Sequence, residues 1–264
     1  MKFLGIDLGW RSGASGLCCL EWNCDRLQLL DLDRKEPIAD LLAWIDTWVQ
    51  PDEGALIGVD APTLIPNATG MRLPDKLTHK YFGKYHAGCY PANLSLPFAQ
   101  RTVDFGLALE AKGFTHAPEI QPQTSGRYQI EVFPHPAIVH LFGLQRILKY
   151  KKGKLAERHL ELTKLYQYIV NILPTLEPAL NFNIEQAETN FSLYPLPFSL
   201  QGAALKAVED RLDSPCAYMA AHWWYWGLER NWVLGRTTGY IVVPASLPVE
   251  SVYLNNTRVI SPEN

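Results

Sequence analysis

The order of apolar and polar positions predicts that the first quarter of the chain forms most of a β-sheet. Two nearly continuous apolar runs are followed by a run that alternates apolar and polar positions, as in a half-exposed strand. A segment with apolar positions at helical spacing then precedes another short apolar run. The expected strands are 2–8, 14–22, 26–33 and 55–60, and the expected helix begins at Pro37 and includes Ile38 to Val49. A helical crossover makes the first and fourth strands parallel neighbours, beside an antiparallel meander formed by the first three.

The rest of the chain predicts one more sheet strand, several helices and a long insertion. A segment rich in Pro and Gly, at about 63–98, is too long for an ordinary connection. Helices are expected at 100–112, 136–148, 155–173 and 200–229, and strands at 128–133 and, on the sheet edge, 239–243. We therefore expect an α/β fold with a mixed five-stranded sheet flanked by helices. Residues 1–264 form a single domain in this prediction, with helical elaboration at about 145–200.

Composition indicates an ordered protein that is not a membrane protein. Hydrophobic residues make up 47% of the chain and charged residues 19%. No apolar run reaches the roughly 18 residues that cross a bilayer. The five cysteines are odd in number and show no Cys-x-x-Cys spacing, which favours reduced thiols in the cytoplasm over disulfides or a zinc site.

Two expected strands end in an aspartate. Asp7 ends the first strand before Leu8-Gly9, and Asp60 ends the fourth before Ala61-Pro62. A carboxylate at the end of a buried strand is costly unless a cation neutralises it, and a divalent metal neutralises two at once. Capping a turn is the other role open to an Asp beside Gly or Pro.

Further acids follow later in the chain. Glu131 lies on the expected strand at 128–133, between two apolar residues, so it needs a partner or a metal. Asp210 and Asp213 are three residues apart, which places them on one face of a helix. Asp213 also precedes Ser214-Pro215, a pattern typical of a helix N-cap.

Basic residues gather in two segments despite a net charge of −3. The segment 146–164 holds seven basic and two acidic residues, and the segment 71–86 holds four basic and one acidic. Such patches can hold phosphates or can be solvated helix faces. The candidates for phosphate contacts are Arg72, Lys76, Lys149, Lys151 and Lys152. His135, between two prolines, is a candidate for positioning water or phosphate, or a turn residue.

The order of these elements resembles the ribonuclease H-like fold. More narrowly, the chain resembles the predicted ribonuclease H-like nuclease family catalogued as domain of unknown function 429. The matching segments are Gly5-Ile6-Asp7-Leu8-Gly9, Gly58-Val59-Asp60-Ala61-Pro62, Gly70-Met71-Arg72, Tyr90-Pro91-Ala92-Asn93, Glu131-Val132-Phe133-Pro134-His135-Pro136, Lys149-Tyr150-Lys151-Lys152-Gly153, the Asp210/Asp213 region and Ile241-Val242-Val243-Pro244.

The resemblance implies a metal-dependent nuclease that hydrolyses RNA or DNA with two Mg²⁺ or Mn²⁺ ions. It makes Asp7 the central ligand, with Asp60 and Glu131 as further ligands. The fourth ligand is Asp213 or Asp210. This choice stays open because family members often read Asp-Ala where this chain reads Asp213-Ser214-Pro215. Hard carboxylate oxygens suit such ions, which would activate water and stabilise both reacting oxygens.

Two other functions remain open on the sequence. One is a non-catalytic interaction module that uses the basic segments as contact surfaces. The other is an actin-like ATPase or small-metabolite kinase, which shares an Asp-x-Gly element such as Asp7-Leu8-Gly9. That class also needs a second phosphate loop, for which Gly235-Arg-Thr-Thr-Gly239 is the nearest candidate.

Overall fold

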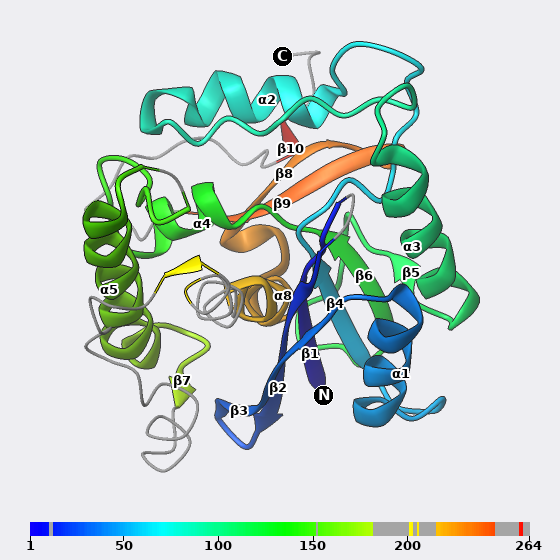
Figure 1. Ribbon diagram of the computed structural model, residues 1–264. Helices are drawn as coiled ribbons and strands as arrows, with labels where there is room; N and C mark the ends of the chain where they lie inside the picture. Colours follow the sequence, from blue (N-terminus) through cyan, green and yellow to red (C-terminus); the bar gives the residue numbers. More distant parts are fainter. Residues whose placement is uncertain are drawn as a thin grey trace.

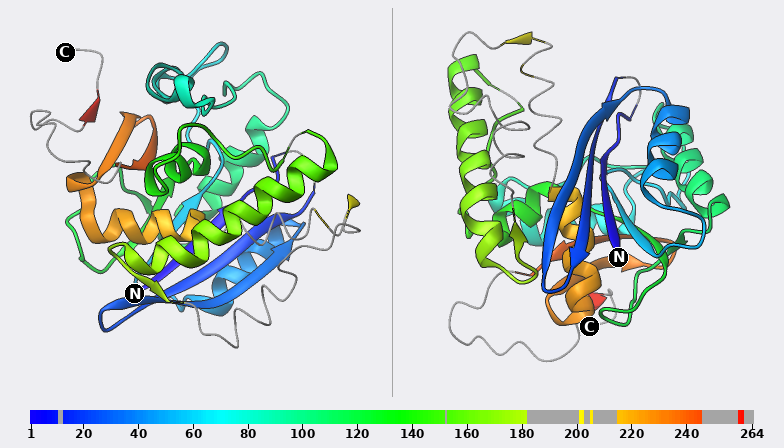
Figure 2. Two further views of the ribbon diagram at one scale, coloured as in Figure 1. Left: turned by 90° about the vertical axis from the view of Figure 1, so that its left-hand side faces the viewer. Right: turned by 90° about the horizontal axis from the view of Figure 1, so that it is seen from below.

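The computed structural model is an α/β fold with helices on both faces of a mixed sheet (Figures 1 and 2). It describes residues 1–10, 13–151, 153–181, 201–202, 205, 215–245 and 259–260. The seven-stranded sheet has the order β5-β6-β4-β1-β2-β3-β7. Its strands are β1 (Lys2–Asp7), β2 (Ser15–Asn23), β3 (Arg26–Lys35), β4 (Ala55–Val59), β5 (Thr115–His116), β6 (Arg127–Glu131) and β7 (Leu180–Asn181).

The five predicted strands form the central part of this sheet, β3-β2-β1-β4-β6. The first three pair antiparallel, and β4 pairs parallel with both β1 and β6, as the apolar pattern indicates. The count of five was too low, because β5 and β7 extend the two edges. Each edge strand has only two residues, too short a run to show a periodic pattern.

Helices cover both faces of the sheet, and three short 3₁₀ helices extend the ends of longer ones. The helices in the described part of the chain are α1 (Ile38–Trp48), α2 (Leu73–Phe82), α3 (Ala99–Ala111), α4 (Pro134–Leu141), α5 (Leu155–Ile172), α8 (Pro215–Trp226), η1 (Gly83–Tyr85), η2 (Leu173–Thr175) and η3 (Gly227–Glu229). α1 and α3 pack on one face, while α4, α5 and α8 lie on the other (Figure 2). None of these helices is long and apolar enough to cross a membrane.

A second sheet lies across the ends of the central strands where β1 and β4 finish (Figure 1). It contains β8 (Asn231–Arg236), β9 (Gly239–Pro244) and β10 (Val259–Ile260). The prediction that 239–243 closes the edge of the main sheet was wrong, because β9 pairs with β8 along its length. One side of this second sheet packs on α2, which belongs to the predicted insertion at about 63–98.

α8 packs directly on the middle of the main sheet because two strands carry glycine there. Gly5 of β1 and Gly58 of β4 are register partners. A Cβ on Gly58 would lie 2.7 Å from the carbonyl oxygen of Cys216, and a Cβ on Gly5 would overlap the backbone nitrogen of Ala217. The first turn of α8 therefore contacts β1 and β4 at Gly5 and Gly58, two residues before Asp7 and Asp60.

We expect Gly5→Ala to lower the free energy of unfolding by about 2–3 kcal/mol, because α8 must move away from the sheet. Urea denaturation measures this change. Gly83→Ala is the matched control, since Gly83 has φ −57° and open space where a Cβ would lie. The control should be neutral or slightly stabilising. Equal stability of Gly5→Ala and the wild type would contradict this packing.

Candidate functional site

Asp7 and Asp60 lie side by side at the ends of β1 and β4. Their strands pair in parallel up to Ile6 and Val59, and the backbone N–H of Asp60 donates to the carbonyl of Ile6 at 2.8 Å. Side chains alternate along strands, so both aspartates belong to the face on which α8 packs against Gly5 and Gly58. The structure thus brings together the two acids that ended the apolar strands.

The Asp7–Asp60 pair is electrostatically strained. Burial raises the pKa of Asp60 well above its usual range, and the negative charge of Asp7 raises it further. Lys151 opposes this shift, because its Nζ lies 3.0 Å from Asp7 Oδ2. Lys151, a predicted phosphate contact, is therefore a direct neighbour of the acids, although 144 residues separate it from Asp7.

Glu131 lines the same cavity as Asp60, and its negative charge adds to the raised pKa of Asp60, but its carboxylate is bound by Arg72. Glu131 is the register partner of Val59, which packs toward α1 and α3, so alternation directs Glu131 to the face opposite Asp7 and Asp60. Its carboxylate accepts two hydrogen bonds from Arg72, at 2.7 and 2.8 Å. Metal ligation by Glu131, as predicted, would have to compete with this bidentate pair.

Arg72, a predicted phosphate contact, lines the cavity but is buried and hydrogen-bonded to protein groups. Its guanidinium donates to Glu131, to Asp75 Oδ1 and to the carbonyl of Leu64, which engages all five of its N–H groups. The side chains of Arg72, Asp75 and Glu131 are only 2%, 0% and 6% exposed. Two buried acids thus share one cation.

Burial raises the pKa of Glu131 from 4.5 to about 7, while Arg72 opposes the shift. The folded protein therefore keeps this proton to a higher pH than the unfolded chain. Stability from this group is complete below pH 4.5 and is lost as the pH rises toward 7. We expect the contribution of Glu131 to the free energy of unfolding in EDTA to fall by about 3 kcal/mol between pH 4.5 and 7.

Urea titrations across this pH range measure the effect. Glu131→Gln should remove the contribution of Glu131 and keep the one that the raised pKa of Asp60 causes, and the exposed Glu119→Gln should behave like the wild type. Equal pH dependence of the wild type and Glu131→Gln would contradict the raised pKa of Glu131.

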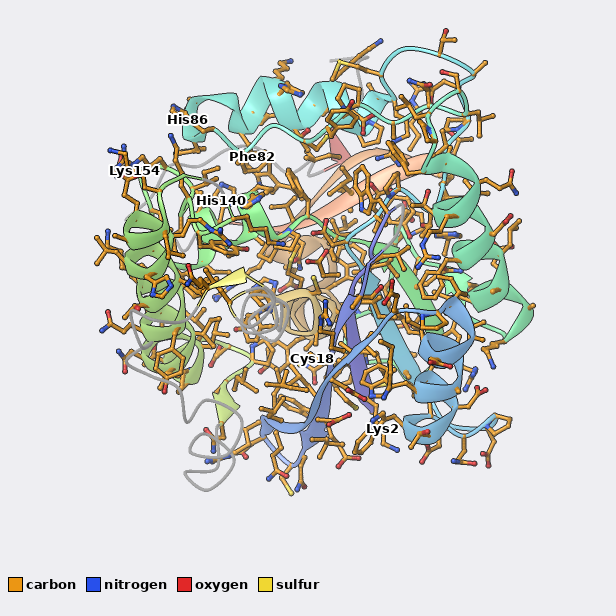
Figure 3. The ribbon with its side chains drawn as sticks, in the orientation of Figure 1. Lys2, Cys18, Phe82, His86, His140 and Lys154 are labelled. Atoms are coloured by element: carbon orange, nitrogen blue, oxygen red, sulfur yellow. The ribbon has the colours of Figure 1, made fainter. Side chains whose placement is uncertain are left out.

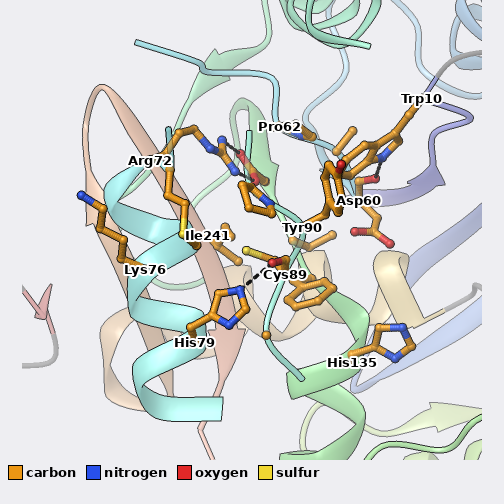
Figure 4. A pocket seen from close by; sticks show the side chains of 17 residues that line it. Trp10, Asp60, Pro62, Arg72, Lys76, His79, Cys89, Tyr90, His135 and Ile241 are labelled. Atoms are coloured by element: carbon orange, nitrogen blue, oxygen red, sulfur yellow. Dashed lines mark hydrogen bonds and ion pairs between the residues drawn. The ribbon is translucent and has the colours of Figure 1, made fainter. Parts of the chain in front are cut away.

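A cavity of about 810 Å³ opens beside Asp60 (Figure 4). Its lining comes from the ends of β4 and β6, from the segment 71–91 and from β9. The residues are Trp10, Asp60, Ala61, Pro62, Met71, Arg72, Lys76, His79, Gly88, Cys89, Tyr90, Pro91, Glu131, Val132, Phe133, His135 and Ile241. The Asp60 carboxylate points into the cavity, with Trp10 and Tyr90 on one side and His135 on the other (Figure 4).

The remaining predicted site residues are divided between the cavity and other places. Lys76 and His135 line the cavity, and His135 also lies edge-on to Phe133. Lys149 is exposed in a separate small pocket with Arg146, Glu157 and Glu161. Asp210, Asp213 and Lys152 lie outside the described residues. Among the residues that are described, no three His, Cys, Asp or Glu side chains form a group that could hold a metal ion.

The family described as Protein of unknown function (DUF429) matches residues 5–233 of the chain. The chain belongs to the DUF429 family. Comparison with curated proteins finds no match. The part of the chain that matches DUF429 includes all of the main sheet except the start of β1, and it includes Asp7, Asp60, Arg72 and Glu131.

Two short segments of the DUF429 chain, 70–75 and 90–93, are hydrogen-bonded to each other at one wall of the cavity. Asn93 Nδ2 donates to the carbonyl of Gly70 at 2.8 Å. Asp75 Oδ2 accepts the backbone N–H groups of Arg72 and Ala92, both at 2.9 Å. Asp75 is therefore the residue that ties the start of α2 to the segment after η1. Its position three residues after Arg72 is the sequence signal for the capping contact with Arg72, whereas the contact with Ala92, 17 residues away, has no local signal.

Proposed function

We propose that this DUF429 protein is a metal-dependent hydrolase of phosphodiester bonds in nucleic acid, with a ribonuclease H-like fold. The observation that carries the proposal is the Asp7–Asp60 pair at the ends of adjacent parallel strands, beside Lys151. The strand order β3-β2-β1-β4-β6, with β2 antiparallel to its neighbours, supports the fold assignment.

The two aspartates fit one divalent cation. Each raises the cost of ionising the other, and a cation between them would remove that cost. Their carboxylate oxygens are the hard donors that Mg²⁺ and Mn²⁺ prefer. When bound, such an ion lowers the pKa of a water molecule and polarises the phosphate.

The second ion of a two-metal mechanism needs additional oxygen ligands. Glu131 is held by Arg72, so Asp210 and Asp213, outside the described residues, are the remaining candidates. The position of α8 supports this idea, because the helix that follows Asp213 begins at Pro215 and packs beside the strands of the aspartate pair.

Cationic and polar side chains of the chain supply the remaining parts of the proposed site. Lys151 neutralises Asp7 and can attract a phosphate to the pair. Lys76 and His135 both line the cavity, His135 on the side of Asp60 and Lys76 across the cavity on α2 (Figure 4), where they can hold a phosphate group or orient water. The buried Arg72 and Glu131 keep the cavity wall in place.

The kinase or ATPase alternative has less support from its predicted second phosphate loop. Gly235 and Gly239 lie in the hairpin between β8 and β9, where Gly239 pairs with Arg236 and Gly235 with Tyr240. Neither glycine lines the cavity beside Asp60, so this turn adds no group to the proposed site.

The proposal is tested by incubating the protein with labelled single-stranded RNA, single-stranded DNA and their duplexes, with Mg²⁺, Mn²⁺ or EDTA. We expect cleavage of at least one substrate with a divalent cation, and none in EDTA. Lack of cleavage with every substrate and ion would contradict the proposal and favour the non-catalytic module.

A further inference from the structure

The cavity beside Asp60 has an apolar interior of the size that takes a small organic group. At about 810 Å³ it falls within the range of ligand sites in proteins. Met71, Pro91, Phe133 and Ile241 contribute apolar surface, while Asp60 lies at its edge. A phosphate alone would not need this apolar space, so the cavity suits a flat, largely apolar group joined to one.

Aromatic rings flank the cavity next to Asp60. Trp10 packs on Phe98 with ring centroids 4.6 Å apart, and Tyr90 meets the same Phe98 edge-on at 6.3 Å. The indole N–H of Trp10 donates to the backbone carbonyl of Asp60 at 3.2 Å, which fixes its orientation. Tyr90 is 64% exposed. The exposed ring of Tyr90, beside the oriented ring of Trp10, is a surface on which a nucleobase can stack.

The two basic segments meet near this cavity, although about 60 residues separate them. The backbone N–H of Ile147 donates to the carbonyl of Tyr85 at 3.0 Å, and His86 and Lys154 lie on the same side of the molecule (Figure 3). Lys76 of the first segment lines the cavity, and Lys151 of the second lies 3.0 Å from Asp7. Lysines thus lie on both sides of the candidate site, as a polynucleotide backbone requires.

We propose that the cavity binds one unstacked base of a single-stranded nucleic acid, stacked against Tyr90 and Trp10, with flanking phosphates on the Lys76 side. Single-stranded nucleic acid is then the substrate class of the proposed site, and the placing of a phosphodiester bond beside Asp60 rests on the proposed function. A base in a duplex is stacked and paired, so it cannot enter a cavity unless it is flipped out. The site therefore prefers single strands to duplexes.

Fluorescence anisotropy with labelled oligonucleotides of about 12 nucleotides tests the inference, since single-strand sites typically take about 4–16 nucleotides. EDTA is present throughout, so that binding is measured without cleavage. Tyr90→Ala removes the ring and Tyr90→Phe keeps it. Leu94→Ala is the matched control, because Leu94 is 53% exposed in the same segment and does not line the cavity.

We expect the single strand to bind at least about 10-fold more tightly than the duplex, and Tyr90→Ala to weaken single-strand binding by about 10-fold. Tyr90→Phe and Leu94→Ala should bind like the wild type. Lys76→Ala should reduce the slope of log affinity against log salt by about 0.7.

Equal binding of duplex and single strand, unchanged binding by Tyr90→Ala, or no binding of either nucleic acid would overturn the inference. Metal-dependent cleavage together with any of these results would leave the proposed hydrolase standing without the base site. Tyr90-dependent binding of single strands by a protein that cleaves nothing would support the base site and contradict the hydrolase.

Discussion

Arg72→Met is expected to lower the free energy of unfolding at pH 7 by about 3–5 kcal/mol. The substitution keeps most of the side-chain volume but leaves Glu131 and Asp75 without the cation they share. Both carboxylates are buried, so they must either bind protons or remain charged in an apolar environment. Asp75 also ties the segment near Ala92 to α2, so we expect the cavity wall to loosen.

Urea denaturation of Arg72→Met measures this loss, with Arg26→Met as the matched control. Arg26 forms an ion pair with Asp25 in which both side chains are largely exposed, at 47% and 69%. Exposed pairs contribute less than about 1 kcal/mol, so the control should have nearly wild-type stability. A similarly small loss for Arg72→Met would show that the buried network does not stabilise the fold.

Asp7→Asn is expected to reduce metal-dependent cleavage by about 10³-fold, or about 4 kcal/mol of transition-state stabilisation. The amide has the shape of the carboxylate but lacks the charge that would hold a cation beside Asp60. In EDTA the same substitution should leave stability unchanged or increase it, because it removes the repulsion that raises the pKa of Asp60. A residue with only a structural role would not combine lost activity with retained stability.

Cleavage assays and urea denaturation of the same Asp7→Asn sample test both parts of this expectation. Asp52→Asn is the control, because Asp52 is exposed in the turn after α1. It should match the wild type in both measurements. Wild-type cleavage by Asp7→Asn would remove Asp7 from the site, and a large loss of stability would assign it to the fold.

The sequence predicted the central strands well because their patterns are local. β1 and β4 are short apolar runs, and the helix between them has one clear apolar face, so their parallel pairing followed from the crossover. The second sheet was missed because nothing local distinguishes β9 as a partner of β8 from an edge strand of the main sheet.

The candidate site was predictable only in part, since its contacts join distant residues. Asp7 and Asp60 could be placed together because each ends a strand and the two strands pair. The pairing of Arg72 with Glu131 spans 59 residues and depends on how α2 packs, which no spacing reveals. The same holds for Lys151, whose loop reaches Asp7 from 144 residues away.

Calorimetric titration of Mn²⁺ tests the central claim most directly, namely that Asp7 and Asp60 together hold a divalent cation. We expect saturable binding by the wild type and by Asp52→Asn, and at least about 10-fold weaker binding by Asp60→Asn, since a tenfold change is about 1.4 kcal/mol of lost ligand interaction. Asp60→Asn that binds Mn²⁺ as tightly as the wild type, or a wild type that binds none, would contradict the account.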